Sequence, residues 1–77
     1  MVEKNVFLKT EQDAVDFAEM VSRDLGDIRL VFDNSTIDAK SVLCVLGMGL
    51  GKKAKLRIVS PNANEIVQKI APYICTE

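Results

Sequence analysis

The chain has 77 residues, and a domain of this size buries only about 60% of the surface that its unfolded chain exposes, so one small core must hold the molecule together. Hydrophobic residues make up 48% of the sequence and charged residues 27%, which disfavours a disordered chain and indicates one folded soluble domain over residues 1–77. A net charge of −1 and an aromatic share of 5% disfavour nucleic acid or an anionic membrane as the partner.

The sequence carries no targeting or cofactor signal. The opening stretch MVEKNVFLKT lacks the apolar segment of a signal peptide, and no apolar run approaches the ~20 residues of a membrane span, so we expect a cytoplasmic protein. Cys44 and Cys75 lack CxxC spacing, and without any histidine they complete neither a zinc set nor a Cys/His pair. We expect no metal, no cofactor and no catalytic residue, with Cys44 a small buried side chain and Cys75 a thiol near the chain end. A disulfide between them is disfavoured in a reducing compartment.

Residues 2–26 predict a strand followed by a helix. Residues 2–8 suit a first strand, and Thr10 with Asp13 matches the pattern that caps the start of a helix. Apolar residues then recur at helical spacing on one face, at Ala14, Phe17, Ala18, Val21 and Leu25. We expect Gly26 to end this helix, because glycine readily adopts the conformation by which a chain leaves one.

Residues 27–38 predict a β-hairpin. Residues 27–32, DIRLVF, alternate between apolar and other side chains in the manner of a half-buried strand. Asp33–Asn34 is a tight-turn pair, and the following STID carries the return strand.

The last third of the chain predicts a strand and a final helix. Residues 53–59, KAKLRIV, alternate strictly, and Pro61–Asn62 then opens a helix in which Asn62 and Glu65 form a second capping pattern. The apolar face of that helix comprises Ile66, Val67, Ile70 and Ile74. Because all these apolar sets need a common interior, we predict a core that contains Ala14, Phe17, Val21, Leu30, Leu56, Ile58, Ile66 and Ile70.

Three glycines, Gly47, Gly49 and Gly51, precede Lys52 and Lys53 and suggest a phosphate-binding loop. A dinucleotide loop needs GxGxxG after a strand and before a helix, and a P-loop needs GxxxxGK[ST] in the same setting. Here the glycines follow a helix-like run and precede a strand, where the helix dipole repels anions. They fit better as the end of a helix and a tight connection into the strand.

The run before these glycines, residues 41–48, is apolar on every side of a short helix. A helix at the surface of so small a domain cannot bury its whole circumference, so part of this surface must be exposed. Two interpretations stay open: an unusually apolar helix without further role, or a patch that docks a partner.

The segment IDAKSVLCVLGMGLGKKAKLRIV resembles the second-helix signature of HPr, the phosphocarrier protein of the bacterial sugar phosphotransferase system, of the form LKSIMGVMSLG before a turn and a strand. The match runs without a gap from about Met20 to Val59, and the final helix agrees in position. The resemblance implies an α+β fold, an open-faced sandwich with four antiparallel strands and three helices on one face. The predicted element order, strand, helix, strand, strand, helix, strand, helix, is that of the family.

The sequence departs from the family at its phosphoacceptor. Members carry a histidine in a HARPA-like motif at the start of the first helix, whereas this chain has no histidine and has LKTEQDA there. Thr10 lies nearest the lost histidine, and without a neighbouring base a threonine offers no equivalent nucleophile. We therefore expect that histidine phosphotransfer is absent.

The resemblance carries over a regulatory serine, Ser41, which a kinase phosphorylates in Gram-positive members so that a transcriptional regulator binds. From the residues alone, Ser41 is expected to be the N-cap of the second helix, and the two roles are compatible. We predict a non-enzymatic, HPr-like regulatory module whose partner surface comprises Lys40, Ser41, Leu43, Leu46 and Met48. The implied partners are proteins, namely a serine kinase, a transcriptional regulator or a transport component. The alternatives are a phosphocarrier that uses Thr10 or a cysteine, and an unrelated binding role on the same fold.

Two charged sets have a structural and a functional interpretation. Lys53, Lys55, Arg57 and Arg29 form either a basic stripe that binds a partner or a solvated outer face of the sheet. The acidic set Glu11, Asp13, Asp16 and Glu19 either complements the dipole of the first helix or repels partners that favour a less acidic one.

Overall fold

The computed structural model describes residues 1–48 and 50–75, and for Met48 the backbone alone. The elements are β1 (Val2–Phe7), α1 (Glu11–Ser22), β2 (Asp27–Val31), β3 (Thr36–Asp38), α2 (Val42–Met48), β4 (Lys53–Val59), α3 (Ala63–Lys69) and a 3₁₀ turn, η1 (Ala71–Tyr73). Their order is the predicted one, with η1 added at the end. β4 occupies the residues that the strict alternation of KAKLRIV predicts.

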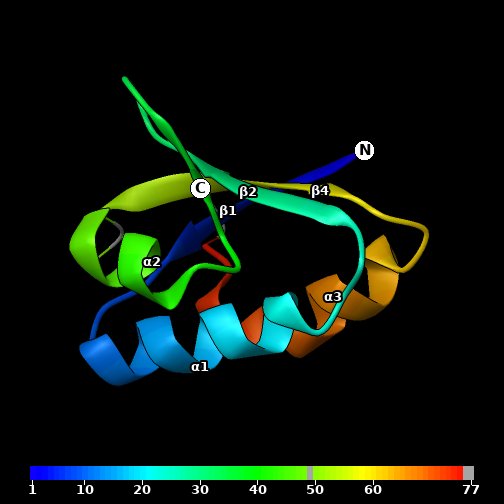
Figure 1. The fold of residues 1–77 in the computed structure, drawn as a ribbon, viewed down its shortest axis with the longest axis horizontal. Helices are drawn as coiled ribbons and strands as arrows, with labels where there is room; N and C mark the ends of the chain where they lie inside the picture. The colour runs from blue at the N-terminus through cyan, green and yellow to red at the C-terminus, as the bar shows by residue number, and fades with distance from the viewer. Residues whose placement is uncertain (49, 76–77) are drawn as a thin grey trace.

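The strands form one antiparallel sheet in the order β1-β4-β2-β3, and Figure 1 shows the three helices on the same side of it. The other side of the sheet is open, so the molecule is the predicted α+β open-faced sandwich. The register places Ile28 opposite Ile58, and Leu30 opposite both Leu56 and Ile37. These rows face the helices, and all eight predicted core residues are buried with them.

The capping box predicted for the first helix is present. The Thr10 hydroxyl accepts from the Asp13 amide at 3.1 Å, while the Thr10 amide donates to the Asp13 carboxylate at 3.3 Å. This reciprocal arrangement satisfies two backbone donors that the start of a helix would otherwise leave free. The buried face of α1 comprises Ala14, Phe17, Ala18 and Val21.

The predicted end of the first helix is wrong. α1 ends at Ser22, and the side chain of Asp24 accepts a hydrogen bond from the Gly26 amide at 2.7 Å. An aspartate that bonds the backbone two residues ahead competes with the helix, so the chain turns before Gly26. Leu25, predicted on the buried face, is consequently fully exposed to solvent. Gly26 is needed for close approach instead, because a Cβ there would lie 2.5 Å from Ser60 Cβ.

The glycine-rich connection combines a confirmed and a corrected prediction. Gly51 has φ of +71° and donates its amide to the Leu8 carbonyl at 2.9 Å, so it forms the tight turn into β4. Gly47 lies inside α2 rather than at its end. The predicted role of Gly49 falls outside the described residues.

The C-terminal region differs from the predicted helix in two respects. Asn62 stands at the N-cap of α3 but its side chain makes no capping bond, and its side-chain NH₂ group donates to Asp24. Ile74 lies beyond the helix and pairs with Val6, while the Cys75 amide donates to the Asn5 carbonyl at 2.7 Å. The chain end therefore covers part of the edge of β1, a long-range pairing that local periodicity does not predict.

Candidate docking surface

The start of α2 is built by two side chains that bond to the backbone. The Asp38 carboxylate accepts from the Lys40 amide at 2.9 Å and turns the chain after β3. The Ser41 hydroxyl then accepts from the Cys44 amide at 3.3 Å, and the Val45 amide donates to the Ser41 carbonyl at 3.0 Å. Ser41 is therefore the N-cap that the sequence predicts.

Lys40 ties the beginning of α2 to the end of α1. Its ammonium group donates to the backbone carbonyl of Asp24, across a separation of 16 residues. A cation at this carbonyl also complements the negative end of the α1 dipole. The Lys40 ammonium thus has an internal partner, and its hydrocarbon stem is the part of the side chain that lines the surface beside Ser41.

The side chains of α2 divide into one buried position and an exposed face. Val45 is completely buried, and Leu46 is half-buried against the core. Leu43 is 82% exposed, an unusual state for leucine in a helix of a small domain. Cys44, predicted to be buried, is also exposed, because Val45 rather than Cys44 points to the core. The side chain of Met48 lies outside what the structure describes.

A second exposed leucine, Leu25, follows Asp24, whose carbonyl accepts from the Lys40 ammonium, so the extended Lys40 side chain links the α1–β2 loop to the residues that precede α2. Sequence periodicity missed this residue, because spacing alone continues the buried face of α1 to position 25. The Arg-Asp-Leu-Gly order, with an aspartate two residues before a glycine, was the available signal for an earlier end. We call the half-buried Lys40 and Ser41 together with the exposed Leu43 and Cys44 the docking surface.

Thr10, nearest the lost histidine, directly precedes α1, and Leu8 two residues earlier pairs with Leu50 just after α2, so the start of α1 lies near the C-terminal end of α2. Both the hydroxyl and the amide of Thr10 are engaged with Asp13 in the capping box. The acidic first turn, Glu11 and Asp13, complements the dipole of α1, as its structural interpretation predicts.

The other ionisable group near this end of α1 is Tyr73. Its ring packs edge-on against Phe17, with centroids 5.8 Å apart and planes at 88°. Burial raises the pKa of the Tyr73 phenol above its usual value, and the nearby carboxylates of Asp16 and Asp13 raise it further. Tyr73 therefore stays a neutral phenol at physiological pH.

The basic side chains on the open face of the sheet are largely balanced. Arg57 pairs with Glu3 at 3.1 Å, and Lys55 lies 3.9 Å from the same carboxylate. Arg29 pairs with Asp27 at 3.0 Å. These pairs favour the solvated-face interpretation over a stripe that binds a polyanion.

Within residues 1–48 and 50–75, no three metal-binding side chains come together, and both thiols are free. None of the helices in this part of the chain has the length and hydrophobicity that crossing a bilayer requires.

The fold closely matches solved structures. One is described as HPr-C-His from Thermoanaerobacter tengcongensis; the match has a TM-score of 0.74 and 23% identity, and covers 94% of this chain and 89% of that chain. Another is the phosphocarrier protein HPr from Bacillus anthracis str. Ames, with a TM-score of 0.71, 25% identity and 96% of each chain covered. The chain therefore has an HPr-like fold. No family model and no curated protein matches the sequence.

Proposed function

We propose that this protein is a cytoplasmic, non-enzymatic relative of the bacterial phosphocarriers that regulates by docking other proteins and does not transfer phosphohistidine. Its fold is similar to that of HPr, yet its sequence contains no histidine. Leu43 carries the proposal, because an exposed leucine two residues after a capping serine presents an apolar anchor that the fold does not need. The proposed partner surface is this docking surface together with Leu46 and Met48.

Ser41 is the proposed switch. A phosphate on its oxygen would lie beside the Cys44 amide, at the positive end of α2. The modified residue would therefore keep the helix start while adding negative charge beside Leu43. A serine kinase of the phosphotransferase system is the proposed modifying partner, and a transcriptional regulator or a transport component is the proposed reader.

The first experiment separates this proposal from a phosphocarrier role. The chain is incubated with enzyme I and labelled phosphoenolpyruvate beside the Bacillus anthracis HPr as positive control. We expect label on the control alone. Stable label on this chain, traced to Thr10, Cys44 or Cys75, would establish the carrier alternative instead.

The second experiment tests docking. The kinase that modifies HPr on serine is added to wild type and to Ser41→Ala, and both are then titrated with candidate regulators. We expect incorporation into wild type only, and binding that Leu43→Ser weakens while Val59→Ser, an exposed valine on the open face, leaves unchanged. Equal binding by the two variants would remove Leu43 from the interface.

A further inference from the structure

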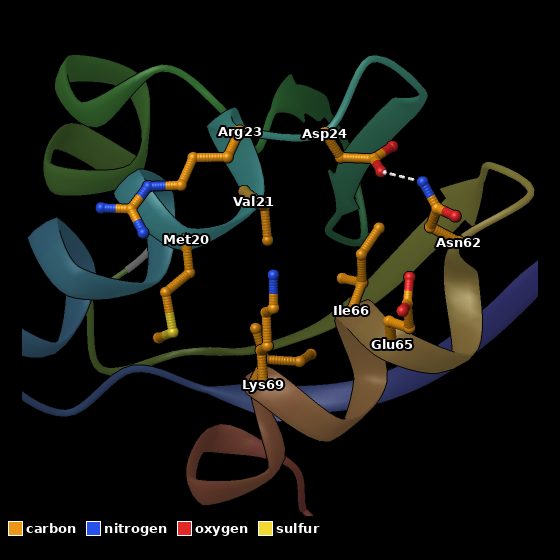
Figure 2. Close-up of a pocket in the computed structure, with 9 residues that line it drawn as sticks. Met20, Val21, Arg23, Asp24, Asn62, Glu65, Ile66 and Lys69 are labelled. Atoms are coloured by element: carbon orange, nitrogen blue, oxygen red, sulfur yellow. Dashed lines mark hydrogen bonds between the residues drawn. The ribbon is translucent and has the colours of Figure 1, made fainter.

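A crevice separates α1 from α3 on the helical side of the molecule. Its volume is about 170 Å³, and Figure 2 shows side chains from the end of α1 and from α3 around it. It lies away from the exposed side chains of α2, and none of the residues assigned to the docking surface lines it. It is lined by α1 and α3 together with residues that flank them, Arg23 and Asp24 after α1 and Asn62 before α3.

Apolar side chains lie beneath the crevice but contribute the smaller part of its accessible lining. Val21 and Ile70 are completely buried beneath it, Ile66 is 5% exposed, and Met20 is half-buried on the α1 side. An engineered apolar cavity of about 150 Å³ holds a benzene molecule, so a ring or a short aliphatic chain is the largest group that this space takes. Methionine adapts its shape readily, which suits a wall that must close on such a group.

The charged groups at the crevice are not equivalent. The Asp24 carboxylate accepts hydrogen bonds from the Gly26 amide and from the side-chain amide of Asn62, at 2.7 and 3.2 Å. Its oxygens are thus already engaged by donors within the protein, although the group keeps its negative charge. Glu65 lies in the first turn of α3, where the helix dipole stabilises a carboxylate.

The two cations, in contrast, are uncommitted. Among the residues that the structure describes, neither Arg23 nor Lys69 forms an ion pair. Figure 2 shows the Lys69 ammonium reaching across the crevice toward Val21, with Arg23 extended above Met20, whereas Asp24 and Glu65 lie on the side of Asn62. An anion that enters on the Met20 side therefore meets two donors with no competing acceptor beside them.

From this geometry we propose that the crevice binds a small carboxylate whose apolar body is no larger than a benzene ring. The body lies on Met20 and Ile66, and the carboxylate is held by Lys69 and Arg23. Arginine pairs with carboxylates through two parallel hydrogen bonds, and lysine supplies a point charge. Such a ligand links α1 to α3, and the inference does not depend on the docking function proposed for α2.

The proposal is tested with the full chain, labelled with ¹⁵N, by following amide chemical shifts during titration with benzoate. We expect saturable shifts confined to Met20–Asp24 and residues 62–70, with a millimolar dissociation constant. Benzyl alcohol and benzylamine, matched in size, should bind more weakly by roughly tenfold, the value of a hydrogen bond to a charged group.

Variants assign the interaction to its residues. Lys69→Gln should weaken benzoate binding by roughly tenfold, whereas Lys52→Gln, the same change at the opposite end of β4, should leave it unaltered. Met20→Trp should abolish binding by filling the space. Three results would each overturn the proposal: no saturation, shifts centred on the open face of the sheet, or equal affinity for benzoate and benzyl alcohol. The spectrum of each variant also reports whether it is folded.

Discussion

The side-chain amide of Asn62 donates to the Asp24 carboxylate at 3.2 Å, and this bond joins the loop after α1 to the start of α3. The two residues are 38 positions apart, so the bond closes the helical layer at one end. The side-chain capping bond predicted for Asn62 is absent. The same Asp24 carboxylate also accepts a hydrogen bond from the Gly26 amide.

This cluster predicts an acid-sensitive contribution to stability. Hydrogen bonds from Ser60, Gly26 and Asn62 lower the pKa of Asp24 below its ordinary value of 3.8, and nearby Lys40 lowers it slightly further. A carboxylate whose pKa is lower in the folded than in the unfolded state stabilises the fold at pH values above its unfolded-state pKa. This contribution is lost as the pH falls through the folded-state pKa. Asp24→Asn should therefore lower stability at pH 7 and have progressively less effect below about pH 4.

Urea unfolding at a series of pH values checks this expectation. Asp33→Asn is the matched control, because no hydrogen bond to the Asp33 carboxylate is seen among the residues described. The control should track wild type throughout. A constant difference between Asp24→Asn and wild type down to pH 2 would show that the carboxylate charge is not what stabilises the cluster.

Gly26 and Gly47 predict opposite responses to alanine. A Cβ at Gly26 would lie 2.7 Å from both Asp24 Oδ2 and the Val59 carbonyl oxygen, as well as against Ser60, so Gly26→Ala should cost about 1–3 kcal/mol of unfolding free energy. A Cβ at Gly47 meets nothing within 4 Å. Gly47→Ala in α2 should stabilise the fold by about 0.5–1 kcal/mol.

Thermal or denaturant unfolding of the two variants decides the point. Both replacements add one methyl group, so the pair controls for the change in composition. Equal destabilisation of both would mean that the close approach at Gly26 relaxes without cost, or that α2 does not hold its helical conformation at Gly47.

Tyr73 supplies a spectroscopic test of the packing between η1 and α1. It is the only tyrosine in a chain without tryptophan, so the ultraviolet absorbance of phenolate reports this residue alone. Because burial, then Asp16 and Asp13, raise its pKa, the absorbance midpoint should lie above pH 10, and Asp16→Asn should shift it downward. Because the phenol has a lower pKa in the unfolded than in the folded state, its contribution to the free energy of unfolding should be fully present below about pH 10. This contribution should be lost as the pH rises through the folded-state pKa. A midpoint at the ordinary value would contradict the packing against Phe17.

The strands and the core were predictable because both rest on periodicity. Burial of Leu30 and Leu56 on the same face follows from the alternation of each strand, and burial of Val21 and Ile66 follows from helical spacing, whereas the register that pairs Leu30 with Leu56 is a finding of the structure. Leu25 shows where this reasoning fails. Periodicity indicates which side of a helix is apolar but not where the helix ends. Here the helix ends before the turn in which the Asp24 carboxylate accepts a hydrogen bond from the Gly26 amide.

The candidate site was predictable to a similar extent. The capping role of Ser41 is local and was predicted, whereas the exposure of Cys44 depends on the rotation of α2 against the core. The hydrogen bond from the Lys40 ammonium to the Asp24 carbonyl is a tertiary contact that spacing does not encode. The partner role of the surface stays a prediction.

The capping role of Ser41 predicts different stabilities for its alanine and aspartate variants. Removing the hydroxyl that accepts from the Cys44 amide should cost ~1 kcal/mol in Ser41→Ala, because a backbone donor loses its partner. Ser41→Asp should retain the full stability of wild type, since a carboxylate caps as well as a hydroxyl and favours the positive end of the helix. Denaturant titration ranks the three proteins. If Ser41→Asp is no more stable than Ser41→Ala, a phosphate would not be accommodated at this position either.

Thr10→His alone should not restore phosphotransfer. A phosphorylated side chain at a helix start is stabilised by free backbone amides and the helix dipole, but here Asp13 already accepts from the Thr10 amide at 3.3 Å and supplies the negative charge. Glu11 adds a second carboxylate in the same turn, so an incoming phosphoryl group is repelled. With enzyme I and labelled phosphoenolpyruvate, Thr10→His should stay essentially unlabelled, and Thr10→His combined with Asp13→Ser and Glu11→Gln should label faster. Rapid labelling of the single variant would show that the acidic first turn is no barrier and that the histidine alone was missing.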